Sequence, residues 1–392
     1  MKRAPLATIP SLFLALAASA CATTPDYGRP LGAGAPALLP LGANEKIPDF
    51  SREWARRDEL APALAQSLAW MRRPHAEQFF PIAGIEHARA LSSLERFERL
   101  LATSTSASGF QKALEREFQV FKSAGWNGKG GGVLFTAYCT PILRGSMFPD
   151  ERHRYPLHAL PDDLVKAKDG SVIGWQTPTK LWPEYPSRAA IEASGLLRGK
   201  ELVWLADPLD AYLAHVNGSA FVELADGTLL RFGYAGKNGR PYSSLGKELE
   251  ADGKIPRGTV SLSTIRAWGA SASPEEVKEY LGRNQSYVFF TPIEDNPHGS
   301  LDVPVTAGRS LATDKTLFPR AALVFATGPE ETPAVNRFLF DQDTGGAIRT
   351  AGRADLYLGV GPEAEREAGQ TRIEGQLYYL FLKDGASSAA PE

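Results

Sequence analysis

The sequence predicts a mostly β fold with peripheral helices, in which a smaller β domain interrupts the main domain. Its 392 residues include 37 glycines and 29 prolines, which supply many turns and favour short strands over a helical bundle. Helical spacing of apolar residues is confined to two regions, residues 51–121 and 261–281. The apolar content of 43% is enough for a large core, and the length favours two domains.

The first 21 residues have the composition of a targeting segment. Lys2 and Arg3 precede an apolar run over residues 9–20, which is too short to span a membrane comfortably. Residues 18–21 (Ala-Ser-Ala-Cys) resemble a bacterial lipoprotein cleavage site. We therefore expect a lipoprotein signal peptide over residues 1–21 and a lipid on Cys21, with ordinary signal-peptidase cleavage as the alternative.

Residues 22–49 are rich in Gly, Ala and Pro and are expected to form a tether. Two or more acyl chains on Cys21 would anchor the protein firmly in a membrane. Ala22 after the cysteine, rather than aspartate, is typical of lipoproteins sent to the outer membrane. The sequence therefore predicts a protein held by lipid at the periplasmic face of that membrane.

Helices are expected on both sides of a strand-rich middle region. The predicted ranges are residues 51–60, 62–71, 85–101, 109–121, 261–269 and 274–281. Pro62 is placed in the first turn of the second helix, where proline is tolerated. Ser273 and Pro274 form an N-cap and a first-turn proline for the last one.

Strands follow the first group of helices. Residues 133–141 are β-branched and aromatic and end at a proline, and residues 222–232 read as a hairpin through Asp226-Gly227. A further strand near residues 287–290 is expected to lead the chain back to the first domain. The predicted domains are residues 50–140 together with 288–385, and residues 141–287 between them.

The most informative stretch is residues 340–359. Asp343 ends an apolar segment and precedes Gly345 and Gly346, which allow a tight reversal or a close approach by another group. Alternation in the following strand places Asp355 on the face opposite its leucines. Aspartate is disfavoured in strands. Two interpretations stay open on the residues alone: Asp343 caps the turn and Asp355 pairs with a nearby arginine, or both carboxyls serve a site.

Two longer motifs in this stretch favour a site. Residues 343–348 (Asp-Thr-Gly-Gly-Ala-Ile) and 353–359 (Arg-Ala-Asp-Leu-Tyr-Leu-Gly), followed by residues 361–364 (Gly-Pro-Glu-Ala), resemble the three-aspartate (3D) domain of the membrane-bound lytic transglycosylase A family. In that pattern the third aspartate is Asp314. The resemblance covers most of residues 75–382.

The earlier strand carries a second part of the resemblance. Residues 136–141 are similar to the family's Thr-Gly-Tyr-Tyr-x-Pro signature, with Thr136 and Tyr138 matching and Ala137 and Cys139 departing from it. In the inserted region, residues 204–212, 216–220 and 233–242 also resemble family blocks. The middle block has Asn-Gly-Ser-Ala where the family usually has Gln-Gly-Ser-Gly.

The resemblance implies a fold and a set of site residues. The fold is a double-psi β-barrel carrying the inserted smaller β domain, with a glycan groove between them. Asp355 is implied to be the catalytic carboxyl and Asp343 its neighbour. The implied substrate-binding residues are Thr136, Tyr138, Gly218, Ser219, Lys237, Asn238, Asp314, Gly345 and Gly346.

The activity implied by the resemblance is that of an exo-acting lytic transglycosylase, which cleaves the β-1,4 bond between N-acetylmuramic acid and N-acetylglucosamine and forms a 1,6-anhydro product. One carboxyl suffices because the C6 hydroxyl of the sugar is the nucleophile, whereas ordinary glycosidases need two carboxyls. Asp355 would act as acid and then as base, with a pKa raised by Asp343 and by burial. We expect Arg349 and Arg353 to point away from the groove, and a guanidinium bonded to Asp355 would refute this. A hydrolase using Asp343 as base and a non-catalytic peptidoglycan-binding lipoprotein are the alternatives.

Composition excludes several other classes. A net charge of −2 gives no field to attract nucleic acid, so the expected partners are peptidoglycan strands, the membrane through the lipid, and other murein enzymes. The six histidines show no metal-ligand spacing, and no cofactor is expected. With Cys21 lipidated, Cys139 has no disulfide partner and is expected to be buried.

Overall fold

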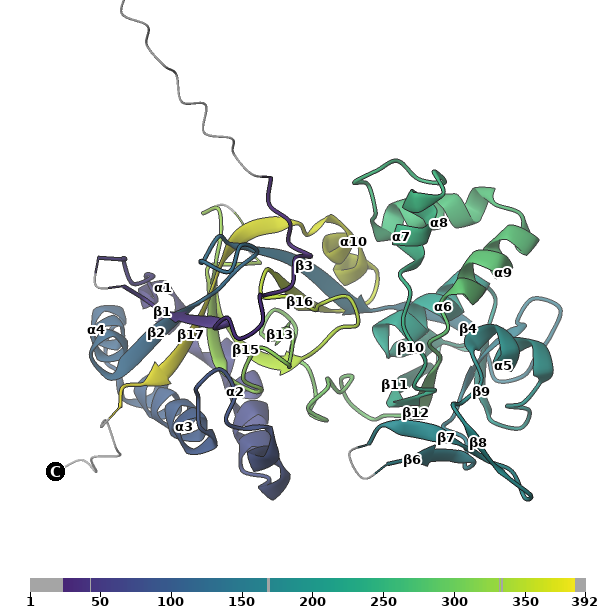
Figure 1. The fold of residues 1–392 in the computed structure, drawn as a ribbon, viewed down its shortest axis with the longest axis horizontal. Helices are drawn as coiled ribbons and strands as arrows, with labels where there is room; N and C mark the ends of the chain where they lie inside the picture. Colours follow the sequence, from purple (N-terminus) through teal and green to yellow (C-terminus); the bar gives the residue numbers. More distant parts are fainter. Residues whose placement is uncertain (1–23, 43, 168–169, 331, 333, 385–392) are drawn as a thin grey trace, which may run out of the picture.

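The structure is a computed structural model that describes residues 24–384 apart from 43, 168–169, 331 and 333. The predicted signal peptide and Cys21 lie outside the described residues. Three sheets and the helices around them make up the described chain (Figure 1), so the predicted mostly β fold with peripheral helices is confirmed. No helix among the described residues is long and apolar enough to cross a bilayer.

The strands of the first sheet come from both ends of the chain. They are β1 (Leu38–Pro40), β2 (Phe118–Ser123), β3 (Val133–Thr140), β13 (Ser310–Ala312), β14 (Leu323–Thr327), β15 (Arg337–Asp343), β16 (Arg353–Val360) and β17 (Ile373–Leu382). Their order is β1-β2-β17-β14-β15-β13-β16-β3, and β17 also pairs with β3. This extra pairing closes six strands, β17, β14, β15, β13, β16 and β3, into a ring.

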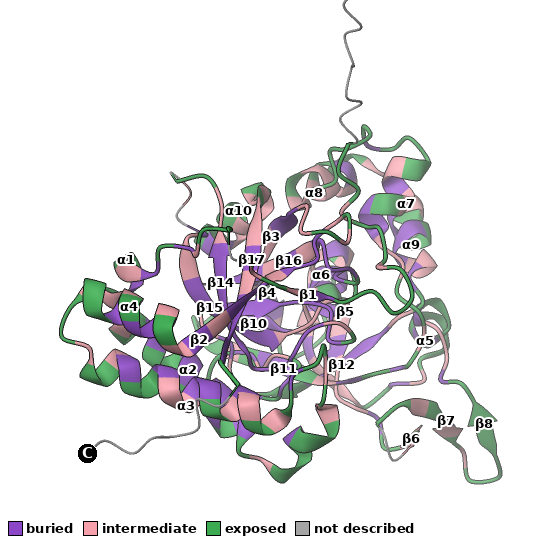
Figure 2. Ribbon diagram, turned by 60° about the vertical axis from the view of Figure 1, so that its left-hand side comes forward, coloured by how far each residue is buried: buried purple, intermediate pink, exposed green. Residues whose placement is uncertain are grey.

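The second and third sheets are built from the middle of the chain. Their strands are β4 (Ile142–Ser146), β5 (Tyr155–His158), β6 (Leu164–Lys166), β7 (Val172–Gln176), β8 (Leu181–Pro183), β9 (Glu201–Leu205), β10 (Ala220–Glu223), β11 (Leu229–Lys237) and β12 (Val288–Pro292). The orders are β12-β11-β10-β4-β9-β5 and β6-β7-β8. Strand β8 is exposed along its whole length and projects from the body (Figure 2).

One predicted domain boundary needs correction. Residues 288–292 were expected to open the second half of the first domain, but β12 pairs with β11 in the second sheet. Val288 and Phe290 are buried there, and Phe290 also forms a bridge to Ala159 after β5. An apolar strand with neighbours on both edges belongs to that sheet, so the chain returns to the first sheet only after Pro292.

The helices surround the two large sheets. They are α1 (Ser51–Trp54), α2 (Arg57–Met71), the 3₁₀ helix η1 (Pro74–Phe79), α3 (His87–Thr103), α4 (Ala107–Glu117), α5 (Arg188–Ser194), α6 (Pro208–Asn217), α7 (Leu245–Ala251), α8 (Leu262–Ser271), α9 (Pro274–Arg283) and α10 (Pro362–Gln370). Helix α3 agrees with its prediction, and α9 begins with Ser273 accepting a bond from the backbone N–H of Glu276, as expected for an N-cap.

Two predicted helix ends are wrong. Pro62 lies inside α2 rather than in a first turn, because the break between α1 and α2 falls at residues 55–56. The helix predicted to reach residue 121 ends at Glu117, and residues 118–123 form β2. Pairing with both β1 and β17 overrides the local helical pattern there.

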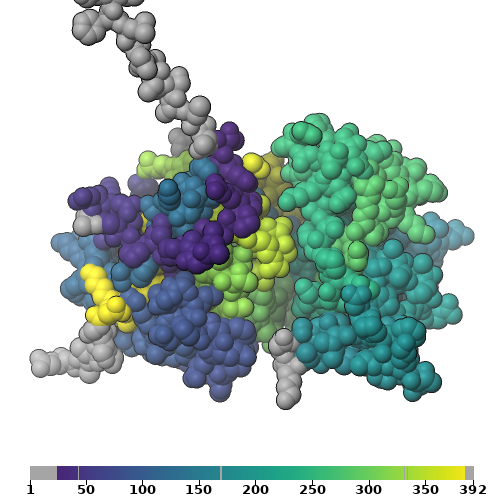
Figure 3. Space-filling model, viewed as in Figure 1, coloured from purple at the N-terminus to yellow at the C-terminus, as the bar shows by residue number. Residues whose placement is uncertain are grey.

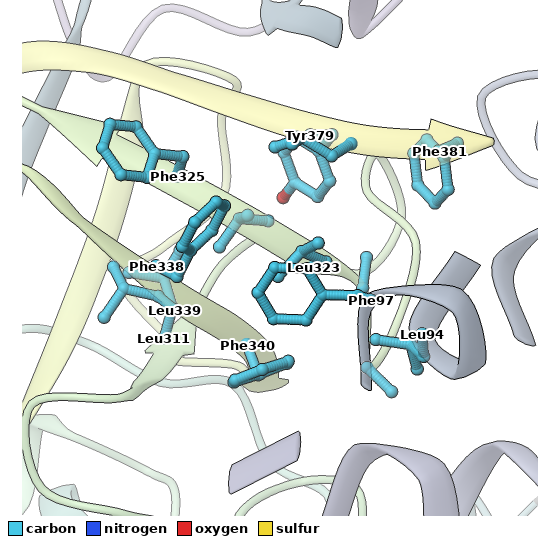
Figure 4. Packing of buried hydrophobic residues seen from close by; sticks show 14 of the residues in the cluster. Leu94, Phe97, Leu311, Leu323, Phe325, Phe338, Leu339, Phe340, Tyr379 and Phe381 are labelled. Atoms are coloured by element: carbon cyan, nitrogen blue, oxygen red, sulfur yellow. The ribbon is translucent and has the colours of Figure 1, made fainter. Parts of the chain in front are cut away.

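A large apolar core fills the space between the strand ring and helices α2 to α4 (Figure 4). Phe338 of β15 lies at its centre. Its ring centroid lies between 4.9 and 6.3 Å from those of four other phenylalanines, at positions 50, 97, 110 and 325. This packing holds β15, the strand that ends in Asp343, against the helices.

A buried ion pair joins the N-terminal helices to the ring. Arg309, just before β13, contacts the carboxylates of Glu53 in α1 and Glu59 in α2. Glu53 is 1% exposed and also accepts the backbone N–H of Phe338. The helices are therefore fixed to the strands that carry the aspartates.

The described part of the predicted tether is packed rather than free. Residues 38–40 form β1 on the edge of β2, and the backbone oxygen of Tyr27 accepts a bond from Thr350 Oγ1 at 2.6 Å. Leu31 packs against the core cluster. The prediction of a tether over residues 22–49 is therefore wrong for the part from Tyr27 to Pro40, where backbone pairing and apolar contacts fix a segment whose composition is typical of a linker.

Candidate active site

Asp343 and Asp355 are brought together by strand register. Strand β13 lies between β15 and β16, and its residue Ala312 is the register partner of both Asp343 and Asp355. The two aspartates therefore occupy one row across three strands. With strands ~4.8 Å apart, their Cα atoms are roughly 9–10 Å from each other.

The strand on the other side of Asp355 completes the row. Strand β3 runs parallel to β16, with Thr136 opposite Asp355 and Tyr138 opposite Tyr357. In β3 the residues at both ends are buried, whereas 136–138 are partly exposed. The accessible part of this strand therefore lies beside the aspartates.

Each aspartate accepts a hydroxyl hydrogen bond from β3. Thr136 Oγ1 donates to Asp355 Oδ1 at 2.8 Å, and Tyr138 Oη donates to Asp343 Oδ2 at 2.7 Å. The sequence singled out these two residues, and the structure places both at the carboxyls. The hydroxyl of Thr136 therefore fixes the orientation of the Asp355 carboxyl.

Asp343 is held by two further donors. The backbone N–H groups of Ser300 and Thr344 donate to its Oδ1 at 2.7 and 2.8 Å. The loop before β13 can come this close because residue 299 is glycine: a Cβ there would lie 3.1 Å from Asp343 Cγ. Sequence reasoning missed this loop, since a backbone donor has no side-chain signal.

The electrostatic environment differs between the two carboxyls. Burial raises the pKa of Asp355 to about 6, although the Thr136 hydrogen bond and the positive charge of Arg353 lower it, and Asp343 adds a smaller upward contribution. Burial also raises the pKa of Asp343, against three hydrogen bonds and Lys315 that lower it. Of the two causes expected for Asp355, desolvation is therefore larger than like-charge repulsion.

Arg353 lies near the Asp355 carboxyl. Its Nη2 donates to Thr136 Oγ1 at 3.1 Å, so the guanidinium is one hydroxyl away from the Asp355 carboxyl. Arg349 lies in an exposed turn, where its Nε donates to the backbone oxygen of Gly346 at 3.4 Å. Neither of these bonds joins a guanidinium to Asp355 itself, although the charge of Arg353 is near enough to lower the pKa of that carboxyl. The orientation of the two arginines relative to the groove stays a prediction.

Beneath Asp343 lies a buried polar cluster. Lys315 contacts Asp341, which is fully buried and also accepts bonds from Thr313 and from Tyr379 Oη. The positive charge of Lys315 also lowers the pKa of Asp343. This cluster supports the end of β15 from below.

Three predicted substrate-binding residues have structural roles instead. Asn238 is 1% exposed, and its Nδ2 donates to the backbone oxygens of Pro186 and Gln285. Asp314 is 4% exposed, and its carboxylate accepts from the backbone and hydroxyl of Thr316. Buried side chains with these partners are not available to a sugar, so their predicted contacts are not supported.

The third is Ser219, which lies at the junction of the two large sheets. Its buried hydroxyl is 3.3 Å from Thr140 Oγ1, which in turn is 3.0 Å from Tyr357 Oη. This hydroxyl chain connects the end of β3 with β16 and with the inserted region. Thr140 and Tyr357 were not among the predicted site residues.

The remaining predicted residues lie at turns or on the surface. Gly218 ends α6 in the left-handed region at φ 72°, a conformation that favours glycine. Lys237 is exposed at the end of β11. Gly345 and Gly346 form the turn after β15, and a Cβ at Gly346 would lie 3.5 Å from the Tyr242 ring of the inserted region. Their contacts with substrate stay a prediction.

A furrow separates the two halves of the molecule (Figure 3), with residues of the C-terminal third on one wall and the inserted region on the other. The close approach of Gly346 to Tyr242 narrows it at one point. Cys139, next to Tyr138 in β3, is buried as predicted, and burial raises the pKa of its thiol to about 12. The thiol is therefore protonated at neutral pH.

Known protein families match both the inserted region and the C-terminal part of the chain. The family described as the MltA specific insert domain matches residues 134–291, and the 3D domain matches residues 309–381. The membrane-bound lytic murein transglycosylase A of Escherichia coli K12 is 32% identical over 286 residues, which is 70% of this chain and 73% of that protein. The chain belongs to the membrane-bound lytic murein transglycosylase A (MltA) family.

Other members of the MltA family are similar to this chain in sequence or in structure. The Vibrio cholerae protein of the same name is 33% identical over 68% of this chain and 70% of its own length. A crystal structure of a membrane-bound lytic murein transglycosylase from Agrobacterium tumefaciens superposes with a TM-score of 0.73 at 28% identity, covering 88% of this chain and 98% of that one. E. coli MltA with bound chitohexaose superposes with a TM-score of 0.63 at 24% identity, covering 94% and 97%.

Proposed function

We propose that the protein is a lytic transglycosylase that cleaves the β-1,4 bond between N-acetylmuramic acid and N-acetylglucosamine in peptidoglycan and leaves a 1,6-anhydromuramoyl product. The observation that carries the proposal is the Asp355 carboxyl. It is partly exposed, its pKa is raised to about 6, and a hydroxyl fixes its orientation. Such a group is protonated often enough near neutral pH to act as a general acid.

The reaction proceeds in two proton transfers. Asp355 first donates its proton to the glycosidic oxygen as the bond to C1 of the muramic acid breaks. The resulting carboxylate then accepts the proton of the C6 hydroxyl, whose oxygen bonds to C1 and closes the 1,6-anhydro ring. Because this nucleophile is already part of the sugar, its effective molarity is high and no second carboxyl has to activate water.

Asp343 supports this chemistry as a neighbour rather than as a second catalyst. Three donors hold its carboxylate oxygens, and each of these bonds makes it a weaker base. Its negative charge adds to the raised pKa of Asp355. Thr136 and Tyr138 are proposed to face the substrate at this position, together with Gly345, Gly346, Gly218 and Lys237 around the furrow.

The fold and domain division fit this function. We infer that the closed six-strand ring is a double-psi barrel, which is supported by its parallel pairs β13–β15 and β3–β16. The second sheet would be the inserted domain and the furrow between them the glycan groove. Lipid attachment at Cys21, anchoring at the periplasmic face of the outer membrane and contacts with other murein enzymes are part of the same proposal.

Product analysis tests the proposal directly. Purified protein is incubated with murein sacculi, and the soluble products are analysed by mass spectrometry for anhydro or reducing ends. Asp355→Asn is expected to lower turnover by ~10²–10⁴-fold, the usual contribution of a general acid. Asp162→Asn, which changes a carboxylate that is 92% exposed, is the matched control and should leave turnover unchanged.

A hydrolase is the second candidate, because Asp343 lies in the same row as Asp355 and ordinary glycosidases use two carboxyls. Products with only reducing ends would support it and exclude the transglycosylase. A non-catalytic binding protein would keep its binding to sacculi in Asp355→Asn and release no products in either form.

A further inference from the structure

A pocket of about 700 Å³ lies in the inserted region, apart from the two aspartates. Helices α5, α6 and α9 and strands β5 and β9 form its walls, on the right-hand side of the molecule in Figure 1. Its volume is within the range of pockets that bind small molecules. No residue of β3, β15 or β16 lines it.

Arg188, one of the residues that line the pocket, is buried and has one donor without a partner among the described residues. Arg188 is 2% exposed, and its guanidinium lies between the rings of Tyr212 and Tyr287, 5.0 Å from each centroid. Nη1 contacts Glu192 at 3.3 Å and Nη2 donates to the backbone oxygen of Ser286 at 2.9 Å, but Nε has no acceptor among the described residues. A buried donor without a partner is unfavourable, so an anionic oxygen from a ligand would be stabilised here.

Two histidines in the wall are uncharged at neutral pH. Burial lowers the pKa of His158 to about 4 and that of His215 well below its ordinary value. Their Nδ1 atoms lie 2.8 Å from Tyr287 Oη and 3.1 Å from the backbone N–H of Val288. The wall is therefore aromatic and polar, and the positive charge of the pocket comes from arginine and lysine.

The rim carries both signs of charge. Arg154, Arg198 and Lys278 are exposed there, and Glu201 and Glu275 line the same opening. A neutral sugar would make no use of the rim cations, and a polyphosphate would be repelled by the glutamates and by Glu192. The charges suit a ligand that carries a carboxylate and an ammonium group together.

We propose that this pocket binds the peptide attached to muramic acid, with a carboxylate at Arg188 and at the rim cations and an amino group near the glutamates. This inference rests on the proposed function, which makes peptide-bearing glycan the substrate. The inserted region would then bind peptide in addition to forming one wall of the furrow. The enzyme would then recognise strands that still carry peptides.

Helix α6 connects the pocket with the junction between the inserted region and β3. Helix α6 supplies Tyr212 and His215 to the pocket and ends at Gly218, next to Ser219, whose hydroxyl contacts Thr140 of β3. A helix is ~10 Å wide. A peptide of three to five residues spans roughly 10–18 Å when extended, which is enough to pass from one side of α6 to the other.

Calorimetric titration with free peptide tests the proposal. The probes are the tripeptide and tetrapeptide released from sacculi, with chitohexaose as a glycan without peptide. Arg198→Ala combined with Lys278→Ala is expected to weaken peptide affinity about tenfold, as is Arg188→Lys, provided its circular dichroism spectrum is unchanged. Lys247→Ala, an exposed lysine outside the pocket, is the control and should bind as the wild type does.

Three outcomes would overturn the assignment. The peptide fails to bind, it binds the variants as well as the wild type, or inorganic phosphate displaces it as effectively as excess peptide does. A kinetic measurement gives a second readout: the ratio of kcat/KM on peptide-bearing over peptide-free strands should fall in the rim variant. Peptide binding is measured without turnover, so loss of the proposed function and loss of this inference are distinguishable.

Discussion

Replacing Thr136 with valine tests whether its hydroxyl controls the pKa of Asp355. The substitution removes the hydroxyl that donates to Asp355 at 2.8 Å and keeps a β-branched side chain of similar size in β3. This hydrogen bond stabilises the ionised carboxyl and lowers its pKa. Its loss should therefore raise the pKa of Asp355 above about 6.

The size of the change follows from the energy of the bond. A hydrogen bond to a charged group contributes about 1.5–3 kcal/mol, and a pKa unit corresponds to about 1.36 kcal/mol. Because Asp355 is partly exposed, water replaces part of the lost bond, and we expect a rise of about one unit. The protonated fraction at pH 7 would then increase from roughly 9% to roughly 50%.

The assay is the pH dependence of anhydro-product release from sacculi. A general acid must be protonated, so activity of the wild type should fall as the pH rises through about 6. In Thr136→Val this fall should occur about one pH unit higher, even if the maximal rate is reduced. Thr136→Ser keeps the hydroxyl and should retain the profile of the wild type.

Arg353 supplies the result that would refute this reasoning. Its guanidinium donates to the same hydroxyl, so it loses a partner in Thr136→Val. If it turned to Asp355, the pKa would decrease and the fall in activity would move to lower pH. A downward shift, or none, would show that the hydroxyl does not control the acid.

Three other substitutions give further tests. Tyr138→Phe removes the hydroxyl hydrogen bond to Asp343 and should lower kcat/KM about tenfold in the product assay. The unfolding midpoint should not change. An unaffected rate would mean that Asp343 needs no fixed orientation. Lys315→Met leaves the buried Asp341 carboxylate without its cation and should lower the free energy of unfolding in urea by about 3–5 kcal/mol. Adding Asp341→Leu should restore only part of that loss, because the buried hydroxyls of Thr313 and Tyr379 then lose their acceptor, and no recovery would place the cause in packing. Asp355→Asn should raise the free energy of unfolding by about 1–3 kcal/mol at pH 8, because the wild-type carboxyl is ionised there and its raised pKa makes ionisation in the folded protein unfavourable. Below pH 3.8 the substitution should give no gain, because the carboxyl is protonated in both the folded and the unfolded protein. An equal gain at both pH values, measured in urea, would contradict the raised pKa.

Much of the site could be predicted from sequence because it depends on motifs in adjacent strands. The strand periods of residues 133–140 and 353–360 predicted β3 and β16, and the motifs placed Thr136 and Tyr138 beside the aspartates. Register then brings each hydroxyl to a carboxyl. Strand periodicity and short motifs involve residues that are near one another in the chain, so they can be recognised in the sequence without knowledge of the fold.

The parts that could not be predicted depend on contacts between distant segments. Ser300 contributes only a backbone N–H to Asp343, which any residue type except proline could supply. Asn238 has a side chain suited to sugars, but its burial against residues 186 and 285 is visible only in the folded chain. Residues 118–121 fit a helix until β1 and β17 pair with them.

The packing of residues 27–40 limits how far the enzyme could work from a membrane. If a lipid is attached at Cys21, only five residues lie between it and Tyr27, whose backbone is bonded to Thr350. The six residue steps from Cys21 to Tyr27 span at most about 20 Å when fully extended. The body of the protein would then stay close to the lipid headgroups, and only glycan strands that pass near the bilayer surface would be within its working distance.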